Sequence, residues 1–113
     1  MNELEKISER RERSHKKLLS FKSKVYNAFL EMEKAAYSDG ALPKKTKELI
    51  AIGISVVLDC ESCMQWHIEQ AAKTGAEDQE ILEAIEVGME MACGRATVSA
   101  RFALEVMDSV YGK

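Results

Sequence analysis

Hydrophobic side chains recur three or four positions apart along most of this chain, the spacing that aligns them on one face of an α-helix. Residues 18–32 and 81–92 show this pattern, and no segment is convincing as a strand. The sequence therefore predicts an all-α fold, a compact helical domain of about five to six helices. The expected helical stretches are about residues 3–36, 43–58, 59–73, 76–93 and the segment between Gly94 and Gly112.

The first of these stretches has two unlike halves. Residues 1–17 are mostly charged and form either a separate helix or a frayed arm, whereas residues 18–36 carry an apolar stripe. We therefore expect a charged N-terminal helical arm over residues 1–17 and a core domain over residues 18–113. The members of the stripe are Leu18, Phe21, Val25, Phe29 and Met32.

Residues 49–58 are apolar on nearly every side of a helix that starts near Pro43. Proline is well suited to a first helical turn. A helix that is apolar almost all round must be buried on most sides, and a chain of 113 residues is too small to bury it completely. We therefore expect a homo-oligomer that assembles through its apolar helices.

The composition, with 46% hydrophobic and 31% charged residues, is that of one globular domain. The net charge of −3 creates no field that attracts nucleic acid, and the basic run at residues 10–17 is diluted by glutamates. The chain start has no apolar signal stretch, and the apolar run 49–58 falls short of the roughly 20 residues that span a bilayer. We expect a cytoplasmic protein that binds neither nucleic acid nor membrane, with its thiols mostly reduced at rest.

Cys60 and Cys63 stand three positions apart, and His67 follows four positions later. On a helix these offsets place the three side chains on one face, with neighbouring Cβ atoms about 5–6 Å apart. A disulfide needs Cβ atoms nearer to about 4 Å, so a small local adjustment would let the cysteines join. Both cysteines fall in an expected first helical turn, where free N–H groups and the helix dipole stabilise a thiolate.

His67 lies one helical turn beyond Cys63, where it can accept the thiol proton or pair with the thiolate. This favours Cys63 as the attacking sulfur and Cys60 as the resolving partner that closes a disulfide. Two alternatives stay open from these residues alone. The cysteines can be small core residues beside an interface histidine, or they can bind structural zinc, although a closed zinc site normally needs four ligands.

Glu48 is separated from Cys60 by eleven residues. A carboxylate near His67 would orient the imidazole and stabilise its protonated form. A straight helix over residues 48–60 would put its ends about 18 Å apart, and an antiparallel helix would recover only about 10 Å for His67. Contact therefore requires a tilted crossing, a water bridge or a neighbouring subunit. The alternative is that Glu48 is simply an acidic residue in a first helical turn.

The combined pattern of Glu48, Cys60-x-x-Cys63 and His67 resembles the signature of the alkylhydroperoxidase D-like group, within the carboxymuconolactone decarboxylase family. The flanking segments 45–50 and 75–81 are also similar to that family. The resemblance extends over about residues 20–110. It implies an alkylhydroperoxidase D-like all-helical fold that assembles into trimers or hexamers.

The resemblance also implies a thiol activity that reduces peroxides or disulfides. In the mechanism proposed for the family, Glu48 and His67 would relay a proton from Cys63, which attacks a hydroperoxide and becomes a sulfenic acid. Cys60 would then condense with that sulfenic acid, and a dithiol reductant, thioredoxin-like or lipoyl-bearing, would reduce the disulfide. No metal or organic cofactor is required. The founding peroxidases carry two helical repeats per chain, whereas this chain has a single core.

Two other functions remain as alternatives. The same cysteine pair would serve a non-peroxidatic disulfide-exchange or redox-sensing oligomer. A carboxymuconolactone decarboxylase-like enzyme would not need the pair, and the presence of two cysteines argues against that branch. Among the remaining residues, Cys93 is expected to be a buried, inert thiol, and Trp66 and Met64 are expected to fill a core or interface more readily than to wall a peroxide pocket.

Overall fold

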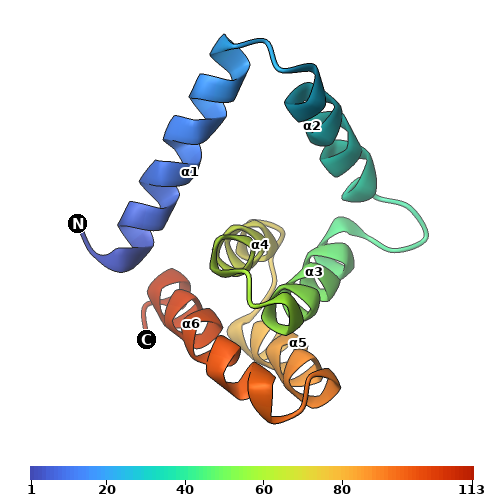
Figure 1. The fold of residues 1–113 in the computed structure, drawn as a ribbon. Coiled ribbons are helices and arrows are strands. Elements are labelled where there is room, and N and C mark those ends of the chain that lie inside the picture. The colour runs from blue at the N-terminus through green and yellow to red at the C-terminus, as the bar shows by residue number, and fades with distance from the viewer.

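A computed structural model describes residues 1–113, and it contains six helices and no strand. The predicted all-α fold is therefore confirmed. The helices are α1 (Glu3–Ser20), α2 (Lys24–Ala36), α3 (Lys44–Leu58), α4 (Glu61–Lys73), α5 (Asp78–Met91) and α6 (Gly94–Tyr111). Figure 1 shows α3 to α6 gathered together, while α1 and α2 form a V that stands over one end of the group.

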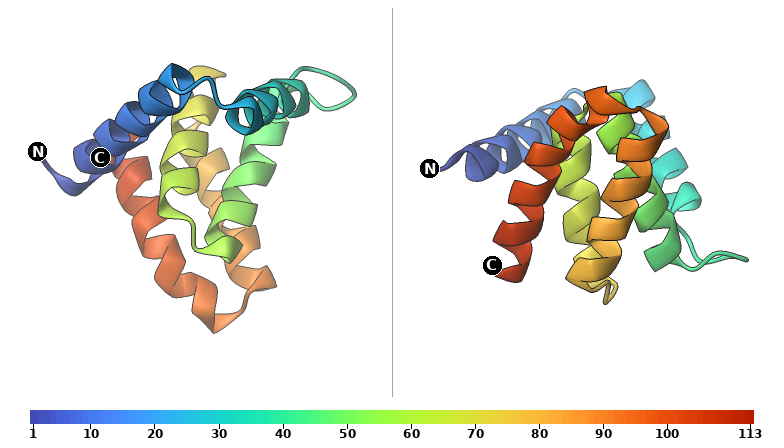
Figure 2. Two further views of the ribbon diagram at one scale, coloured as in Figure 1. Left: turned by 45° about the horizontal axis from the view of Figure 1, so that its top comes forward. Right: turned by 90° about the horizontal axis from the view of Figure 1, so that it is seen from below.

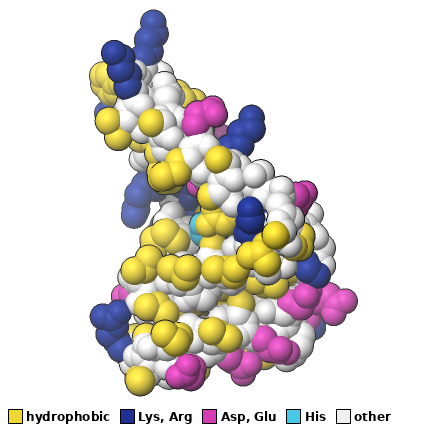
Figure 3. All heavy atoms as spheres, turned by 90° about the vertical axis from the view of Figure 1, so that its right-hand side faces the viewer, with side chains coloured by type: hydrophobic (Ala, Val, Ile, Leu, Met, Phe, Trp, Pro, Cys, Tyr) yellow, Lys and Arg dark blue, Asp and Glu magenta, His cyan; other side chains and the backbone are white.

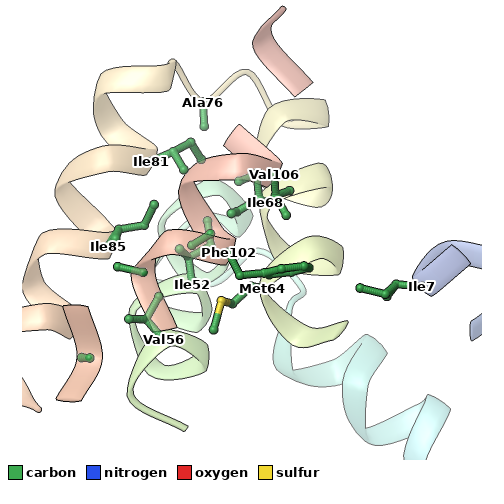
Figure 4. Close-up of a cluster of buried hydrophobic side chains, with 14 residues drawn as sticks. Ile7, Ile52, Val56, Met64, Ile68, Ala76, Ile81, Ile85, Phe102 and Val106 are labelled. Carbon is green, nitrogen blue, oxygen red and sulfur yellow. The ribbon is translucent and has the colours of Figure 1, made fainter. Parts of the chain in front are cut away.

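The hydrophobic core lies among α3, α4, α5 and α6, the four helices that Figure 2 shows packed together. Its largest fully buried apolar side chains, several of them labelled in Figure 4, are Ile52, Val56, Met64, Ile68, Ile81, Ile85 and Val106. The residues on α3, α4 and α5 form pairs four positions apart, and Phe102 precedes Val106 by four on α6, so each helix turns one apolar stripe inward. The core therefore follows directly from the hydrophobic periodicity of residues 44–111.

Helices α3 and α5 approach each other closely at two glycines. A Cβ atom on Gly88 would lie 2.6 Å from the carbonyl oxygen of Gly53 and 3.2 Å from the Cβ of Val56. Only a residue without a side chain fits at such a crossing. The pair of glycines therefore sets how closely α5 packs against the helix that carries Glu48.

The N-terminal third consists of two helices rather than one continuous helix over residues 3–36. Lys22 adopts a left-handed conformation with φ 55°, which ends the first helix. Ser23 then caps α2 by accepting a hydrogen bond from the Tyr26 N–H at 3.1 Å. The charged half is a separate helix, one of the two forms expected for it. The domain boundary between residues 17 and 18 stays a prediction, since α1 continues to Ser20.

The apolar stripe of residues 18–32 does not enter the core. No residue of α2 is buried, and the side chains of Val25 and Met32 are 83% and 63% exposed. On α3, Ile54 and Leu58 are likewise 53% and 67% exposed, although Ile52 on the same helix is fully buried. The chain alone therefore leaves part of its apolar helix surface uncovered.

Cys93 lies on the surface, so the expectation of a buried thiol is wrong. The helix before it ends at Met91, and Cys93 stands in the turn before Gly94, with a left-handed φ of 54°. A residue in such a connection does not share the buried face of either helix.

None of the six helices is both long and apolar enough to cross a membrane.

Candidate active site

The turn between α3 and α4 determines where the cysteine pair lies. Asp59 ends α3 in the left-handed conformation, with φ 54° and ψ 44°. The next residue, Cys60, returns to extended backbone and donates its N–H to the carbonyl of Ser55 at 3.0 Å. The chain thus reverses within two residues, and α4 packs back against α3.

Residues of α6 hold this turn in place. The Oδ1 of Asp59 accepts a hydrogen bond of 2.8 Å from the hydroxyl of Ser99, which is buried. The guanidinium of Arg95 donates to the carbonyl of Val57 at 2.8 Å. These two contacts stabilise a left-handed conformation that is costly for a residue other than glycine.

Cys60 is the N-cap of α4 rather than a residue of its first turn. Its Sγ accepts a hydrogen bond from the Cys63 N–H at 3.3 Å, the position that a serine or aspartate oxygen takes in an ordinary N-cap. A thiolate at Cys60 would therefore face the positive end of the helix dipole and one of its unpaired N–H groups.

Cys60 and Cys63 are joined by a disulfide, with their Cα atoms 5.2 Å apart. The extended backbone of Cys60 supplies the local adjustment that the helical spacing required, because the residue leaves the helix at its cap. Both cysteines are partly exposed. The bond is therefore within reach of solvent and of a reactant molecule.

His67 contacts Glu48 directly and within one chain, with 2.6 Å between Nδ1 and Oε1. The carboxylate is 2% exposed and the imidazole 14% exposed, so the pair is well shielded. Since a carboxylate only accepts, Nδ1 donates, which leaves Nε2 of a neutral ring as the proton acceptor. The pair therefore has the geometry of a histidine base held in one tautomer by a buried carboxylate.

The sequence argument overestimated the gap between these two residues. The helix ends at Leu58, so the rise from Glu48 to the turn is about 15 Å, and the return from Glu61 to His67 is about 9 Å. The remaining offset of about 6 Å is within reach of the two side chains. Neither a bridging water nor a second subunit is needed for the contact.

Tyr37 is a site residue that sequence reasoning missed. Its ring lies against the imidazole of His67, with ring centroids 5.1 Å apart and the planes tilted by 34°. Burial, and then the charges of Glu48 and Glu33, raise the pKa of Tyr37 above its ordinary value. Tyr37 follows the last turn of α2, outside any periodic pattern, so no signal in the sequence pointed to it.

A cavity of about 650 Å³ opens beside the cysteine pair, between α1, α2 and α4. Cys63 and His67 line it, and Trp66, Phe29 and Leu30 give it an apolar wall. Trp66 thus lines the cavity beside Cys63 and His67, although the sequence favoured a place in the core or an interface. The other lining residues are Ser8, Arg11, Glu12, His15, Tyr26, Glu33, Ser62, Glu69 and Lys73.

Potential metal ligands are dispersed in this structure. No group of three or more His, Cys, Asp or Glu side chains lies close enough together to hold a metal ion. The second histidine, His15, contacts the hydroxyl of Tyr26 through Nδ1 at 2.6 Å. The groups that the site brings together are two sulfurs, an imidazole and a carboxylate.

The sequence profile of the Carboxymuconolactone decarboxylase family matches residues 23–106, which include both cysteines, Glu48 and His67. The chain belongs to the carboxymuconolactone decarboxylase family. The resemblance noted from the spacing of these residues is thereby confirmed. The matched segment begins at the N-cap of α2, so α1 lies outside it.

Two bacterial relatives are similar over most of this family member. Protein 4 of the cox locus of Paracoccus denitrificans is 41% identical over 88 residues, which cover 78% of this chain and 79% of the relative. A protein of Cupriavidus necator is 34% identical over 84 residues, covering 74% of each chain.

Solved structures of the family share the fold. A carboxymuconolactone decarboxylase family protein of Legionella pneumophila, in its apo form, superposes with a TM-score of 0.91 at 29% identity, covering 97% of this chain and 98% of that one. A family protein of Thermotoga maritima, with a suggested part in the antioxidative response, superposes with a TM-score of 0.84 at 28% identity, covering 95% and 91% of the two chains. These matches include α1 as well as the family segment.

Proposed function

We propose that this protein is a thiol-dependent peroxidase that reduces hydroperoxides through a Cys60–Cys63 disulfide cycle. The observation that carries the proposal is the disulfide beside His67, whose Nδ1 is held by the buried carboxylate of Glu48. A cysteine activated by a base that a third group orients is the arrangement expected for thiol nucleophiles. Family membership and the suggested antioxidative role of the Thermotoga maritima protein support the same reaction.

In the first step, Nε2 of His67 accepts the Cys63 thiol proton, and the thiolate attacks the outer peroxide oxygen. The S–O bond forms as the O–O bond breaks, so sulfur is oxidised and the peroxide is reduced. The proton held by His67 passes to the leaving oxygen, which departs as an alcohol. The products of the step are a Cys63 sulfenic acid and that alcohol.

In the second step, the sulfur of Cys60 attacks the Cys63 sulfenic acid, the disulfide forms, and water departs. An external dithiol, thioredoxin-like or lipoyl-bearing, then attacks the disulfide and leaves with its own sulfurs oxidised. The cycle uses no metal or organic cofactor. We place it in the cytoplasm, where a pool of reduced thiols can supply the dithiol.

Rapid mixing of the reduced protein with a hydroperoxide tests this function. We expect one Cys60–Cys63 disulfide per chain, formed much faster than free cysteine reacts, with Cys93 still free in a peptide map. If peroxide reacts no faster than with free cysteine while the disulfide exchanges quickly with dithiols, the disulfide-exchange function replaces the peroxidase. Turnover of a lactone acid that survives Cys63→Ser would instead favour the decarboxylase-like enzyme.

We also propose that the protein works as a homo-oligomer, a trimer or hexamer. Hydrophobic side chains run in a band across the face seen in Figure 3. The exposed apolar residues of α2, α3 and α5 are Val25, Phe29, Met32, Ile50, Ile54, Leu58, Val87 and Met91. Such an apolar surface is typical of a protein–protein interface, and in a closed ring of identical chains it would lie between neighbouring subunits.

A further inference from the structure

The side chain of Arg11 crosses from α1 to the first turn of α4, where it contacts Ser62, one of the two residues between the cysteines. Its Nε and Nη2 donate to the hydroxyl of Ser62 at 3.2 and 3.1 Å, and Nη2 also donates to the Ser62 carbonyl at 2.9 Å. Nη2 reaches Oε1 of buried Gln65 at 2.9 Å as well. The guanidinium carbon lies 5.5 Å from the ring centroid of Trp66. Arg11 is thus bound to three residues of one helix.

These contacts fix the position of the guanidinium relative to the cysteine pair. Gln65 also donates from Nε2 to the carbonyl of Leu4 at 2.8 Å, so α4 holds α1 at a second point. Burial lowers the pKa of Arg11, and the charge of Glu69 opposes that shift. A guanidinium nevertheless stays protonated at physiological pH. Arg11 therefore brings a permanent positive charge to this turn.

The peptide between Ser62 and Cys63 connects Arg11 to the sulfur of Cys60. Its carbonyl oxygen accepts from Arg11 at 2.9 Å, while its N–H donates to Cys60 Sγ at 3.3 Å. A cation at the carbonyl end of a peptide polarises it and strengthens the hydrogen bond that its N–H donates. Arg11 therefore stabilises a negative charge on the Cys60 sulfur by polarising the peptide group that lies between them. Cys63 lines the same cavity as Arg11.

We propose that Arg11, which lies outside the family-matched segment, is a positioning residue for the cysteine pair: it holds the Ser62–Cys63 peptide and stabilises the thiolate form of the reduced motif. The inference rests on the proposed thiol function, because it assigns Arg11 a role only in a pair that cycles between disulfide and thiolate. The proposal extends the functional site to α1, the helix that carries Arg11.

Other charged and titratable groups also surround the cysteine pair, and they too influence the pKa of its thiols. They come from every helix that borders the cavity, and Glu48 stands behind His67 on α3. The groups are Glu12 and His15 on α1, Tyr26 and Glu33 on α2, Tyr37 after α2, Asp59 before Cys60, and Glu61, His67, Glu69 and Lys73 on α4. None of these groups donates a hydrogen bond to Ser62, whereas Arg11 donates three. Removal of Arg11 therefore changes both the charge and the geometry at the motif.

The test is the pH dependence of thiol alkylation in the reduced protein, measured in a Cys93→Ser background with iodoacetamide and peptide mapping. Arg11→Met keeps an apolar stem against Trp66 but removes the charge and the donors. We expect it to raise the alkylation midpoint of the pair by about half to one pH unit, a loss of thiolate of about threefold to tenfold at a fixed pH. We expect Arg11→Lys to recover part of this shift, since it restores the charge without the guanidinium geometry.

Arg13→Met is the matched control, because Arg13 carries the same charge on the same helix and is 70% exposed beside Glu9. It should leave the midpoint unchanged. We also expect Arg11→Met to shift the dithiol–disulfide equilibrium with glutathione toward the disulfide, because the reduced thiolate loses its stabilisation. A wild-type midpoint in Arg11→Met, or an equal shift in Arg13→Met, would overturn the inference.

If Arg11→Met loses helical content by circular dichroism, Arg11→Gln decides the question, because glutamine keeps a polar side chain that can donate to Ser62 but carries no charge. A raised midpoint in Arg11→Gln supports the inference, and an unchanged midpoint contradicts it. Alkylation requires no peroxide, so this outcome is independent of whether the protein proves to be a peroxidase.

Discussion

The imidazole of His67 and the carboxylate of Glu48 form a hydrogen bond of 2.6 Å across the α3–α4 interface, with the carboxylate only 2% exposed. The bond requires α4 to fold back tightly on α3, which the left-handed conformation of Asp59 allows. The turn that aligns the pair also puts Cys60 at the N-cap of α4. One local reversal of the chain therefore assembles all four candidate residues.

The first prediction concerns His67 as the base for Cys63. We expect His67→Ala to raise the alkylation midpoint of Cys63 and to slow the reaction with hydroperoxide by about 10²–10⁴-fold, the usual contribution of a positioned base. His15→Ala, at the other histidine that lines the cavity, is the control. An unchanged thiolate titration in His67→Ala would remove His67 from the mechanism.

The second prediction separates the roles of the two cysteines. We expect Cys60→Ser to react once with hydroperoxide and to stop as a Cys63 sulfenic acid, because no resolving thiol is present. Cys63→Ser should lose the fast reaction altogether, and Cys93→Ser should behave like the unaltered protein. Trapping with dimedone followed by mass spectrometry shows which sulfur carries the oxygen. Fast sulfenate formation on Cys60 in Cys63→Ser would reverse the assignment.

Much of this site could be predicted from the sequence because its residues lie at helical spacing. The offset between Cys63 and His67 is one helical turn, and the periodic apolar positions of residues 44–111 are the ones that form the core. The reach of Glu48 could not be derived, since it depends on the conformation of one residue, Asp59, and on the angle at which two helices cross.

The missed features share a physical cause. Tyr37 and Arg11 contact the site from α2 and α1, two helices that bury almost no apolar surface and whose placement no hydrophobic pattern specifies. Cys93 was wrongly expected to be buried because the C-terminal end of α5 was placed at residue 93, two residues beyond its actual end at Met91. Helix ends and polar tertiary contacts are the features that periodicity determines least.

A third prediction addresses assembly through the exposed apolar face. We expect Ile54→Lys, at a side chain that is 53% exposed on α3, to lower the mass measured by sedimentation toward that of one chain. A buried charge without a partner is strongly disfavoured at an interface. Thr97→Lys places the same side chain at an exposed position of α6 and should leave the mass unchanged. If both variants sediment like the unaltered protein, Ile54 lies outside any interface.

A fourth prediction concerns the stability of the α5 start at low pH. Glu80 accepts a hydrogen bond of 3.0 Å from the Glu77 N–H and pairs with Lys45 at 3.1 Å, and these contacts lower the pKa of Glu80. Ionised Glu80 therefore stabilises the folded state fully above the pKa that Glu80 has in the unfolded chain. This stabilisation is lost as the pH falls through the lower pKa that Glu80 has in the folded protein. Glu80→Gln should therefore flatten the acid side of the stability curve measured by urea unfolding. Glu86→Gln on the same helix, which leaves the Glu77 contact intact, is the control, and an equal flattening in both would contradict the assignment.

The last prediction tests the glycine contact that holds α5 against α3. A Cβ on Gly88 would lie 2.6 Å from the Gly53 carbonyl oxygen, and this backbone atom cannot move aside as a flexible side chain can. We expect Gly88→Ala to destabilise the protein by about 1–3 kcal/mol or more through overpacking, despite the better helix propensity of alanine. Gly94→Ala, where a Cβ meets no atom within 4 Å, should be neutral. Because α3 carries Glu48, we further expect Gly88→Ala to slow the reaction with hydroperoxide. An unchanged unfolding midpoint in Gly88→Ala would contradict the prediction, because it would show that the two helices can separate at this crossing without cost.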